Sequence, residues 1–208
     1  VSRGCSYGRC TFCAEGGRGG GSLISTGFDW VSELASFHER APLYFQDSIF
    51  PKSKEVREQL LPLLRDLDVP WGCQVYLGAL SRSFVAELAE SGCVYVYTGL
   101  ESASADILSG IGKVGVDRDT LAKRLGWFRD EGLRVGISLM FGAMSMSGEL
   151  LETEATVAET VRLAGEIRSD GVAVTGFYSN VQTVLPSTAL ARGLSRVGVV
   201  IDFFSMPR

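Results

Sequence analysis

The sequence of 208 residues carries a formal net charge of −4, and 46% of its residues are hydrophobic and 21% charged. This length and balance are typical of one globular domain with a sizeable core. The acidic balance offers no broad basic surface, so nucleic acid is not a predicted partner. The most apolar stretch, 197–204, is short and interrupted by Asp202, so no membrane span is predicted.

The chain opens on a cluster of cysteines. Three of the five cysteines, Cys5, Cys10 and Cys13, fall within residues 2–13, S-R-G-C-S-Y-G-R-C-T-F-C. The C-x4-C-x2-C spacing is too tight for a disulfide framework and lets several thiolates reach one metal centre. We interpret it as an iron–sulfur ligand loop. With three thiolates, one iron of such a cluster stays open to an external ligand.

Two other interpretations of the cysteine cluster stay open at this point. A structural zinc site takes four ligands, normally from paired knuckles, and no second knuckle follows. A ferredoxin-like electron carrier needs a fourth cysteine. Cys73 and Cys93 lie in apolar runs, where a cysteine more often packs as a small hydrophobic residue. Reduced clustered thiols favour a cytoplasmic protein.

Predicted helices and strands alternate along the rest of the chain. Segment 15–22 is a glycine-rich loop, and the single histidine, His38, lies on a predicted helical segment and is not assigned a function. Helices are predicted at 29–38, 52–67, 81–90, 117–131 and 149–167. Strands are predicted at 43–46, 69–77, 93–100, 133–141 and 172–178.

This alternation predicts an α/β fold with a parallel sheet buried on both faces. Five strands are visible and a sixth is implied immediately before Cys5, which is too few for a closed eight-stranded barrel. An open partial barrel or a doubly wound sheet fits, and both place the working site at the carboxyl ends of the strands. Asp47, Glu101 and the segments 142–144 and 180–186 follow strands and should meet there.

Several motifs resemble the radical S-adenosylmethionine (SAM) superfamily, most of all its cobalamin-associated and methylthiotransferase-like members. The cysteine loop resembles their C-x3-C-x2-C loop, with one added residue. Segment 44–50, Y-F-Q-D-S-I-F, resembles their F-x-D-D-x-F, and 98–104, T-G-L-E-S-A-S, resembles G-L-E-S-G-S. Segment 136–142 followed by Glu149 resembles G-x-I-x-G…E, and 185–190 resembles P-G-T-P-L.

This resemblance implies a radical SAM core over residues 1–208, built as a partial (β/α)6 TIM-like barrel. The chain starts at Val1 without methionine or a leading strand, so we expect an excerpt of a longer protein. Its first strand would lie before Val1 and its last unit near 171–197. The implied cofactors are a [4Fe–4S] cluster and SAM, with cobalamin used only through a region absent here. The implied electron donor is a flavodoxin or ferredoxin.

The resemblance also implies roles for individual residues. Cys5, Cys10 and Cys13 would ligate the cluster irons. The remaining roles concern SAM: Asp47 would hold its amino group, Glu101 its ribose or amino group, Lys113 its carboxylate, and Phe12 and Met140 its adenine. The charges suit these partners. The substrate, a small molecule or a peptide, is not predicted, although Tyr76, Tyr95 and Tyr97 are candidate contacts.

Overall fold

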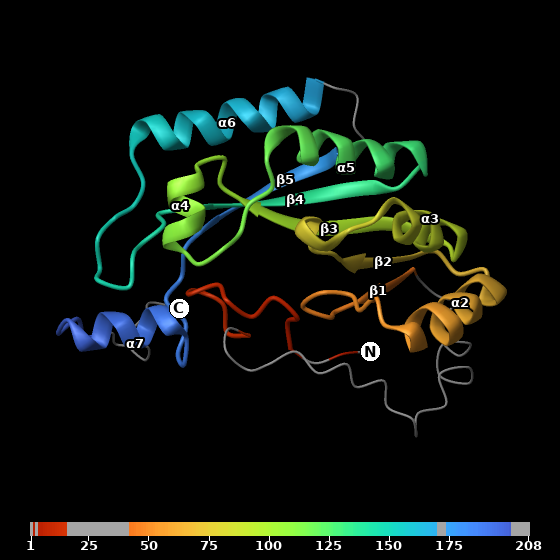
Figure 1. Ribbon diagram of the computed structural model, residues 1–208, viewed down its shortest axis with the longest axis horizontal. Helices are drawn as coiled ribbons and strands as arrows, with labels where there is room; N and C mark the ends of the chain where they lie inside the picture. Colours follow the sequence, from red (N-terminus) through yellow and green to blue (C-terminus); the bar gives the residue numbers. More distant parts are fainter. Residues whose placement is uncertain (1, 3, 16–41, 170–173, 201–208) are drawn as a thin grey trace.

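The structure is a computed structural model that describes residues 2, 4–15, 42–169 and 174–200 (Figure 1). The predicted helix at 29–38, which holds His38, lies outside the described residues, as does nearly all of the glycine-rich segment 15–22. The start of the predicted strand at 172–178 also lies outside them.

A single parallel sheet of five strands organises the described residues (Figure 1). Its strands are β1 (Leu43–Phe45), β2 (Trp71–Gln74), β3 (Cys93–Glu101), β4 (Arg134–Phe141) and β5 (Val174–Val181). Their spatial order is β1-β2-β3-β4-β5, so neighbours in the chain are neighbours in the sheet. A doubly wound sheet reverses its strand order at a switch point, whereas a barrel does not. The partial-barrel alternative is therefore confirmed.

The helices follow the predicted alternation, except that two short helices were not predicted and one long helix starts later than predicted. A π-helical segment (Val56–Leu60) runs into α2 (Leu61–Leu67), and a 3₁₀ turn (Leu77–Ala79) precedes α3 (Arg82–Glu90). The others are α4 (Ala105–Gly110), α5 (Arg118–Asp130), α6 (Glu154–Ser169) and α7 (Ala189–Arg196). The sequence missed α4 and α7 because they span too few turns to show a helical period.

The start of α6 was also predicted too early. It begins at Glu154 and not at 149, because the preceding backbone pairs with another loop. Ser145 N donates to Glu149 O at 2.9 Å and Leu151 N to Ala143 O at 2.8 Å. Residues 149–151 are thereby tied to the turn after β4.

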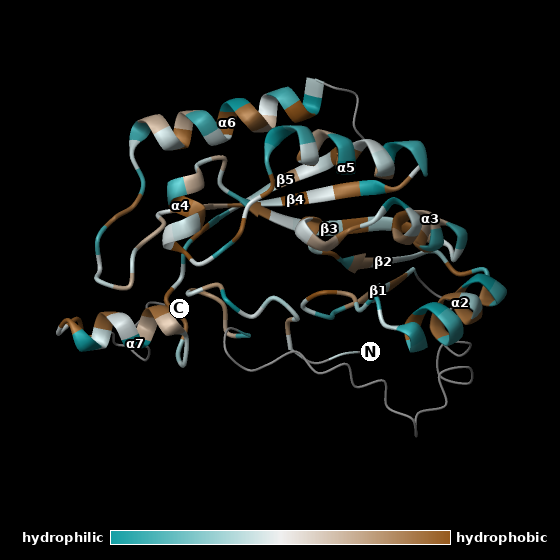
Figure 2. Ribbon diagram, viewed as in Figure 1, coloured by the Kyte–Doolittle hydropathy of each residue, from teal (hydrophilic) through white to brown (hydrophobic). Residues whose placement is uncertain are grey.

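One face of the sheet forms the main core. Helices α2, α3, α5 and α6 cover it and turn their apolar sides inward (Figure 2). Val96, Val135 and Ile137 lie on this face and are fully buried. Trp71 is fully buried as well, packs edge-on against Phe45 at 5.4 Å and donates its Nε1 proton to Ser91 O at 2.7 Å. Buried aromatic packing and a satisfied indole N–H both stabilise this core.

The opposite face of the sheet differs from the prediction. The apolar strands predicted burial on both faces, but Tyr44 and Tyr178 remain 41% and 47% exposed. Tyrosine and glycine alternate there with core residues, so only one face is fully covered in the described part of the chain.

None of the described helices is both long and apolar enough to cross a membrane.

Candidate cofactor site

The cysteine loop lies at the carboxyl ends of the strands, beside α4 and α7 (Figure 1). Two backbone hydrogen bonds hold its centre. Thr11 N donates to Ile111 O at 2.9 Å, and Leu190 N donates to Thr11 O at 2.8 Å. Thr188 caps α7 by accepting from Ala191 N at 3.1 Å, which positions Leu190. The two helices missed in the sequence therefore flank and anchor the loop.

Tyr7 makes a second attachment between the cysteine loop and the segment after α4. Its hydroxyl donates to Gly112 O at 2.8 Å and accepts from Val114 N at 2.8 Å. Its ring packs against Tyr76 at 5.2 Å. Gly112 has φ +69°, and a Cβ there would lie 2.6 Å from Arg9 O. Only glycine therefore allows this close approach of the two backbones.

Tyr7→Phe is expected to loosen this attachment, because both Gly112 O and Val114 N lose their partner. The expected loss is about 1–2 kcal/mol of stability. Hydrogen exchange at the Val114 amide should become faster, and the melting temperature should fall by a few degrees. Tyr44→Phe is the control, since its hydroxyl lies away from this segment. Unchanged exchange at Val114 in Tyr7→Phe would contradict the bridge.

The three clustered thiols are all half-buried. Gly8 N donates to Cys5 Sγ at 3.5 Å. Burial raises the pKa of Cys10 to about 11; the positive charge of Lys113 opposes this shift, and the neighbouring Cys13 and Cys5 add to it. The three thiols are thus close enough to influence one another electrostatically.

The described residues contain no group of three or more histidine, cysteine, aspartate or glutamate side chains arranged to hold a single metal ion. A structural zinc site requires all its ligands to converge on one ion. A cubane cluster makes a different demand, since each cysteine binds a different iron. Sulfur donors on one loop, with a backbone N–H directed at Cys5, fit such a cluster.

Glu101 and Lys113 form a buried ion pair next to the cysteines. Lys113 Nζ lies 2.8 Å from Glu101 Oε1 and donates to Gly99 O at 2.8 Å. The side chains of Lys113 and Glu101 are 11% and 12% exposed. The sequence assigned these residues separately to SAM, and only the structure shows that they pair with each other.

The backbone at the pair is unusual. Glu101 has φ +66°, beside an irregularity in the β3–β4 register between Gly99 and Glu101. Backbone in this region is costly for a residue with a side chain and persists where its surroundings hold it. A Cβ on Gly99 would lie 2.2 Å from Glu101 Oε1 and 2.7 Å from Lys113 Nζ. Gly99 therefore leaves the space that the pair fills.

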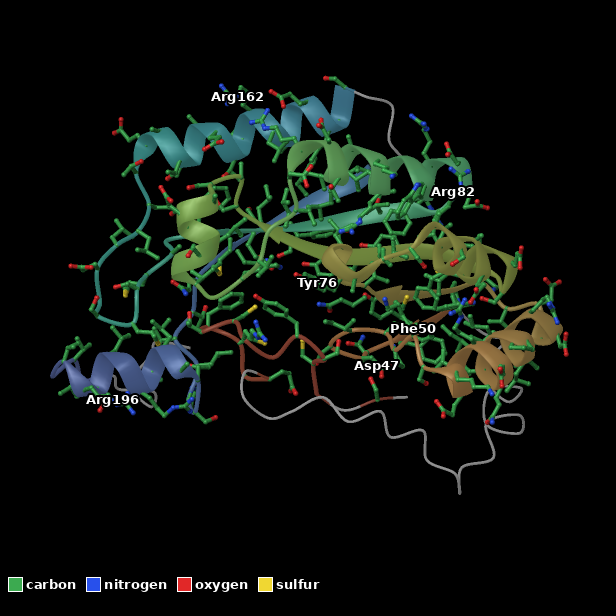
Figure 3. The ribbon with its side chains drawn as sticks, in the orientation of Figure 1. Asp47, Phe50, Tyr76, Arg82, Arg162 and Arg196 are labelled. Carbon is green, nitrogen blue, oxygen red and sulfur yellow. The ribbon has the colours of Figure 1, made fainter. Side chains whose placement is uncertain are left out.

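Asp47 lies buried just after β1. Its carboxylate accepts from the Ser2 backbone N–H and from Ser2 Oγ, the latter at 2.6 Å. Asp47 therefore connects the start of the cysteine loop to the end of β1. Figure 3 shows Asp47 and Tyr76 near the cysteine loop, whereas Arg82 and Arg162 lie on the outer helices.

Phe12 and Met140 meet in a second, smaller hydrophobic cluster beneath α4. Its other members are Ile107, Leu108, Ile111, Ala143 and Leu151. Ser104 caps α4 by accepting from Ile107 N at 3.4 Å, and this N-cap serine was the sequence signal that could have revealed the helix. The structure thus brings Phe12 and Met140 together; adenine contact stays a prediction.

Two side chains that the sequence did not single out hold the turn after β4. Glu152 accepts from Gly142 N, and Gln182 Oε1 accepts from Met144 N. Gln182 N also donates to Phe141 O at 2.7 Å. Segments 142–144 and 180–186 therefore meet, as predicted. Glu149, which the motif comparison selected, is exposed, and Glu152 makes the contact with Gly142 instead.

No protein-family model matches the sequence. An uncharacterized methyltransferase of Pyrococcus horikoshii, PH0819, is 28% identical over 137 residues, which cover 61% of this chain and 30% of that protein.

Solved structures match the fold over most of the chain. The radical SAM methyltransferase TsrM from Kitasatospora setae, with cobalamin and a [4Fe–4S] cluster bound, has a TM-score of 0.71 at 20% identity, covering 91% of this chain and 37% of that one. TsrM with tryptophan substrate and the SAM analogue aza-SAM gives 0.64 at 21% identity, covering 85% and 34%. The cobalamin-dependent SAM radical enzyme OxsB gives 0.67 at 15% identity, covering 94% and 34%.

The chain therefore has the fold of a radical SAM core, and the resemblance seen in its motifs is confirmed at the level of the fold. It spans about a third of the length of these relatives, from 30% of PH0819 to 37% of TsrM.

Proposed function

We propose that residues 1–208 are the core domain of a radical SAM enzyme that uses Cys5, Cys10 and Cys13 to hold a [4Fe–4S] cluster. The observation that carries the proposal is the position of the three thiols. Their loop is anchored at the carboxyl ends of a parallel partial barrel, beside the Glu101–Lys113 pair. When bound, the cluster would supply one electron to cleave SAM to methionine and a 5′-deoxyadenosyl radical that abstracts hydrogen from the substrate.

The chain's own residues would bind and orient SAM. Its methionine part is a zwitterion, and the Glu101–Lys113 pair has complementary charges. Glu101 would accept a hydrogen bond from the ammonium group of SAM, and Lys113 would pair with its carboxylate. The ion pair between Glu101 and Lys113 would then be replaced by two ion pairs with SAM. Asp47 would add a carboxylate at the ammonium group. Phe12 and Met140 would cover the adenine and keep water from it.

The electron-carrier alternative requires a fourth thiolate. Cys73 faces the core with no exposed surface, and Cys93 is buried and donates its thiol proton to Tyr95 O at 3.5 Å. Burial raises the pKa of Cys73 well above its ordinary range, which favours the protonated thiol. Neither of the two remaining cysteines is therefore disposed as a cluster ligand, and the open iron of a radical SAM enzyme is the better fit.

Methyl transfer to a small molecule is the reaction that we propose for the whole protein. It is supported by the names of PH0819 and TsrM, both methyltransferases, and by the tryptophan substrate of TsrM. Cobalamin would be bound through a region outside these 208 residues, and a flavodoxin or ferredoxin would deliver the electron.

The proposal is tested by low-temperature electron paramagnetic resonance (EPR) on anaerobically reconstituted, reduced protein, with and without SAM. We expect a [4Fe–4S]⁺ signal whose g values change when SAM is added. Liquid chromatography should detect methionine released from SAM. A [2Fe–2S] signal indifferent to SAM, or stoichiometric zinc without iron, would overturn the proposal.

A further inference from the structure

Four tyrosines from three strands gather on the half-open face of the sheet. We call Tyr44, Tyr95, Tyr97 and Tyr178 the tyrosine face. The rings of Tyr44 and Tyr95 lie 6.3 Å apart, and those of Tyr97 and Tyr178 lie 5.6 Å apart in an edge-to-face arrangement. The side chains of Tyr95 and Tyr178 meet over Gly136, which joins the two pairs. The four rings therefore form one continuous aromatic surface across β1, β3 and β5.

Glycines in the strands make room for the rings of the tyrosine face. A Cβ on Gly136 would lie 2.1 Å from Tyr95 Oη and 3.0 Å from Tyr178 Cε2. One on Gly72 would lie 3.1 Å from Tyr44 Cδ2, and one on Gly176 would lie 3.6 Å from Tyr178 Cε2. Because these positions carry no side chain, the tyrosine rings pack directly against the strand backbone, and the glycines place no side chain between them.

The tyrosine face is uncharged. By strand register it also carries Gln74, Ser138 and Asn180, and Asn180 Nδ2 donates to Ser138 Oγ at 3.3 Å. Among the described strand residues, no charged side chain lies on it between Arg134, where β4 begins, and Glu101, where β3 ends. The surface offers aromatic rings, hydroxyls and amides to a ligand. The ammonium group of Lys113 lies over Gly99 at the Glu101 end of the face, where it is paired with Glu101.

The phenols of Tyr44 and Tyr95 stay protonated at neutral pH. Burial raises the pKa of Tyr44 to about 12. Burial, and after it the neighbouring Tyr178 side chain, raise the pKa of Tyr95 well above its ordinary range. Because Tyr44 and Tyr178 are nevertheless 41% and 47% exposed, their rings have surface left for a ligand.

We propose that the tyrosine face binds an uncharged aromatic ring of the substrate, with polar ring substituents toward Ser138 and Asn180. Aromatic rings prefer the offset and edge-to-face contacts that the four tyrosines present. Gly99, paired with Ser138, continues this face, and the Glu101 carboxylate and the Lys113 ammonium lie over it, so a ring bound here lies next to the candidate cofactor site. This inference rests on the proposed function, because it takes the barrel interior as the substrate side.

The test compares 2-naphthol with two probes of the same skeleton, decahydro-2-naphthol and 2-naphthyl phosphate. Affinities for the anaerobically reconstituted protein are measured by titration calorimetry, and saturation-transfer NMR reports the tyrosine ring contacts. We expect 2-naphthol to bind about five- to tenfold more tightly than the saturated alcohol, the equivalent of one aromatic pair. The phosphate should bind more weakly than 2-naphthol, since the cation that borders the face, Lys113, is already paired with Glu101.

Tyr97→Leu and Tyr178→Leu should each remove most of the preference for 2-naphthol and leave the SAM-sensitive EPR signal unchanged. Retention of that signal shows that each variant is folded. Val161→Ala is the control, because Val161 is 58% exposed on α6, away from this face. Equal binding of the aromatic and saturated alcohols, tighter binding of the phosphate, or full preference in both leucine variants would overturn the inference. Loss of the EPR signal in the unmodified protein, with the 2-naphthol preference intact, would instead count against the proposed function.

Discussion

Alanine in place of Cys5, Cys10 or Cys13 is expected to abolish the [4Fe–4S]⁺ EPR signal and the cleavage of SAM, whereas Cys73→Ala should retain both. Each of the three clustered cysteines would supply one iron ligand, and nothing else on the loop replaces a lost thiolate. Cys73 lies in the core without exposed surface, so its replacement should cost only about 1 kcal/mol of stability, equivalent to one small buried group.

The matched measurement is iron and sulfide content, EPR and product release for all four variants, prepared side by side. Circular dichroism verifies that each is folded. A Cys73→Ala protein without a cluster would make Cys73 a ligand and restore the electron-carrier interpretation. A Cys13→Ala protein with a full cluster would remove Cys13 from the ligand set.

The second large effect is expected at the buried ion pair. Lys113→Met leaves the Glu101 carboxylate buried without its cation, which should cost about 3–5 kcal/mol of unfolding free energy. The double variant Glu101→Gln with Lys113→Met should recover most of that loss, because neither side chain then carries an unpaired buried charge. Chemical denaturation of the three proteins measures both quantities.

Measuring the SAM affinity of the same variants distinguishes a purely structural role of the Glu101–Lys113 pair from a role in binding SAM. Both the single and the double variant should bind SAM weakly, since the cation for its carboxylate is absent in each. Gly99→Ala should act similarly by displacing the pair, because its Cβ would meet Glu101 Oε1 at 2.2 Å and Lys113 Nζ at 2.7 Å. Full SAM affinity in the double variant would show that the pair is structural only.

The sequence by itself determined the features that depend on local spacing. Cys5, Cys10 and Cys13 lie on one loop whatever the fold, so their proximity could be predicted from their positions. The alternation of apolar strands and amphipathic helices predicted the parallel α/β sheet, because each segment carries its own period. Asp47 and Glu101 could be placed at the working edge because all parallel strands end on the same side.

Only the tertiary structure decided which of these groups touch. Glu101 and Lys113 pair because a left-handed backbone at Glu101 and the empty space at Gly99 let the two side chains meet. Tyr7 reaches Gly112 through a chain separation of more than one hundred residues. Contacts of this kind depend on strand register and on the approach of distant loops, which no local period encodes. The same register joins Tyr95 and Tyr97, which the sequence offered as candidate substrate contacts, with Tyr44 and Tyr178, which it did not single out.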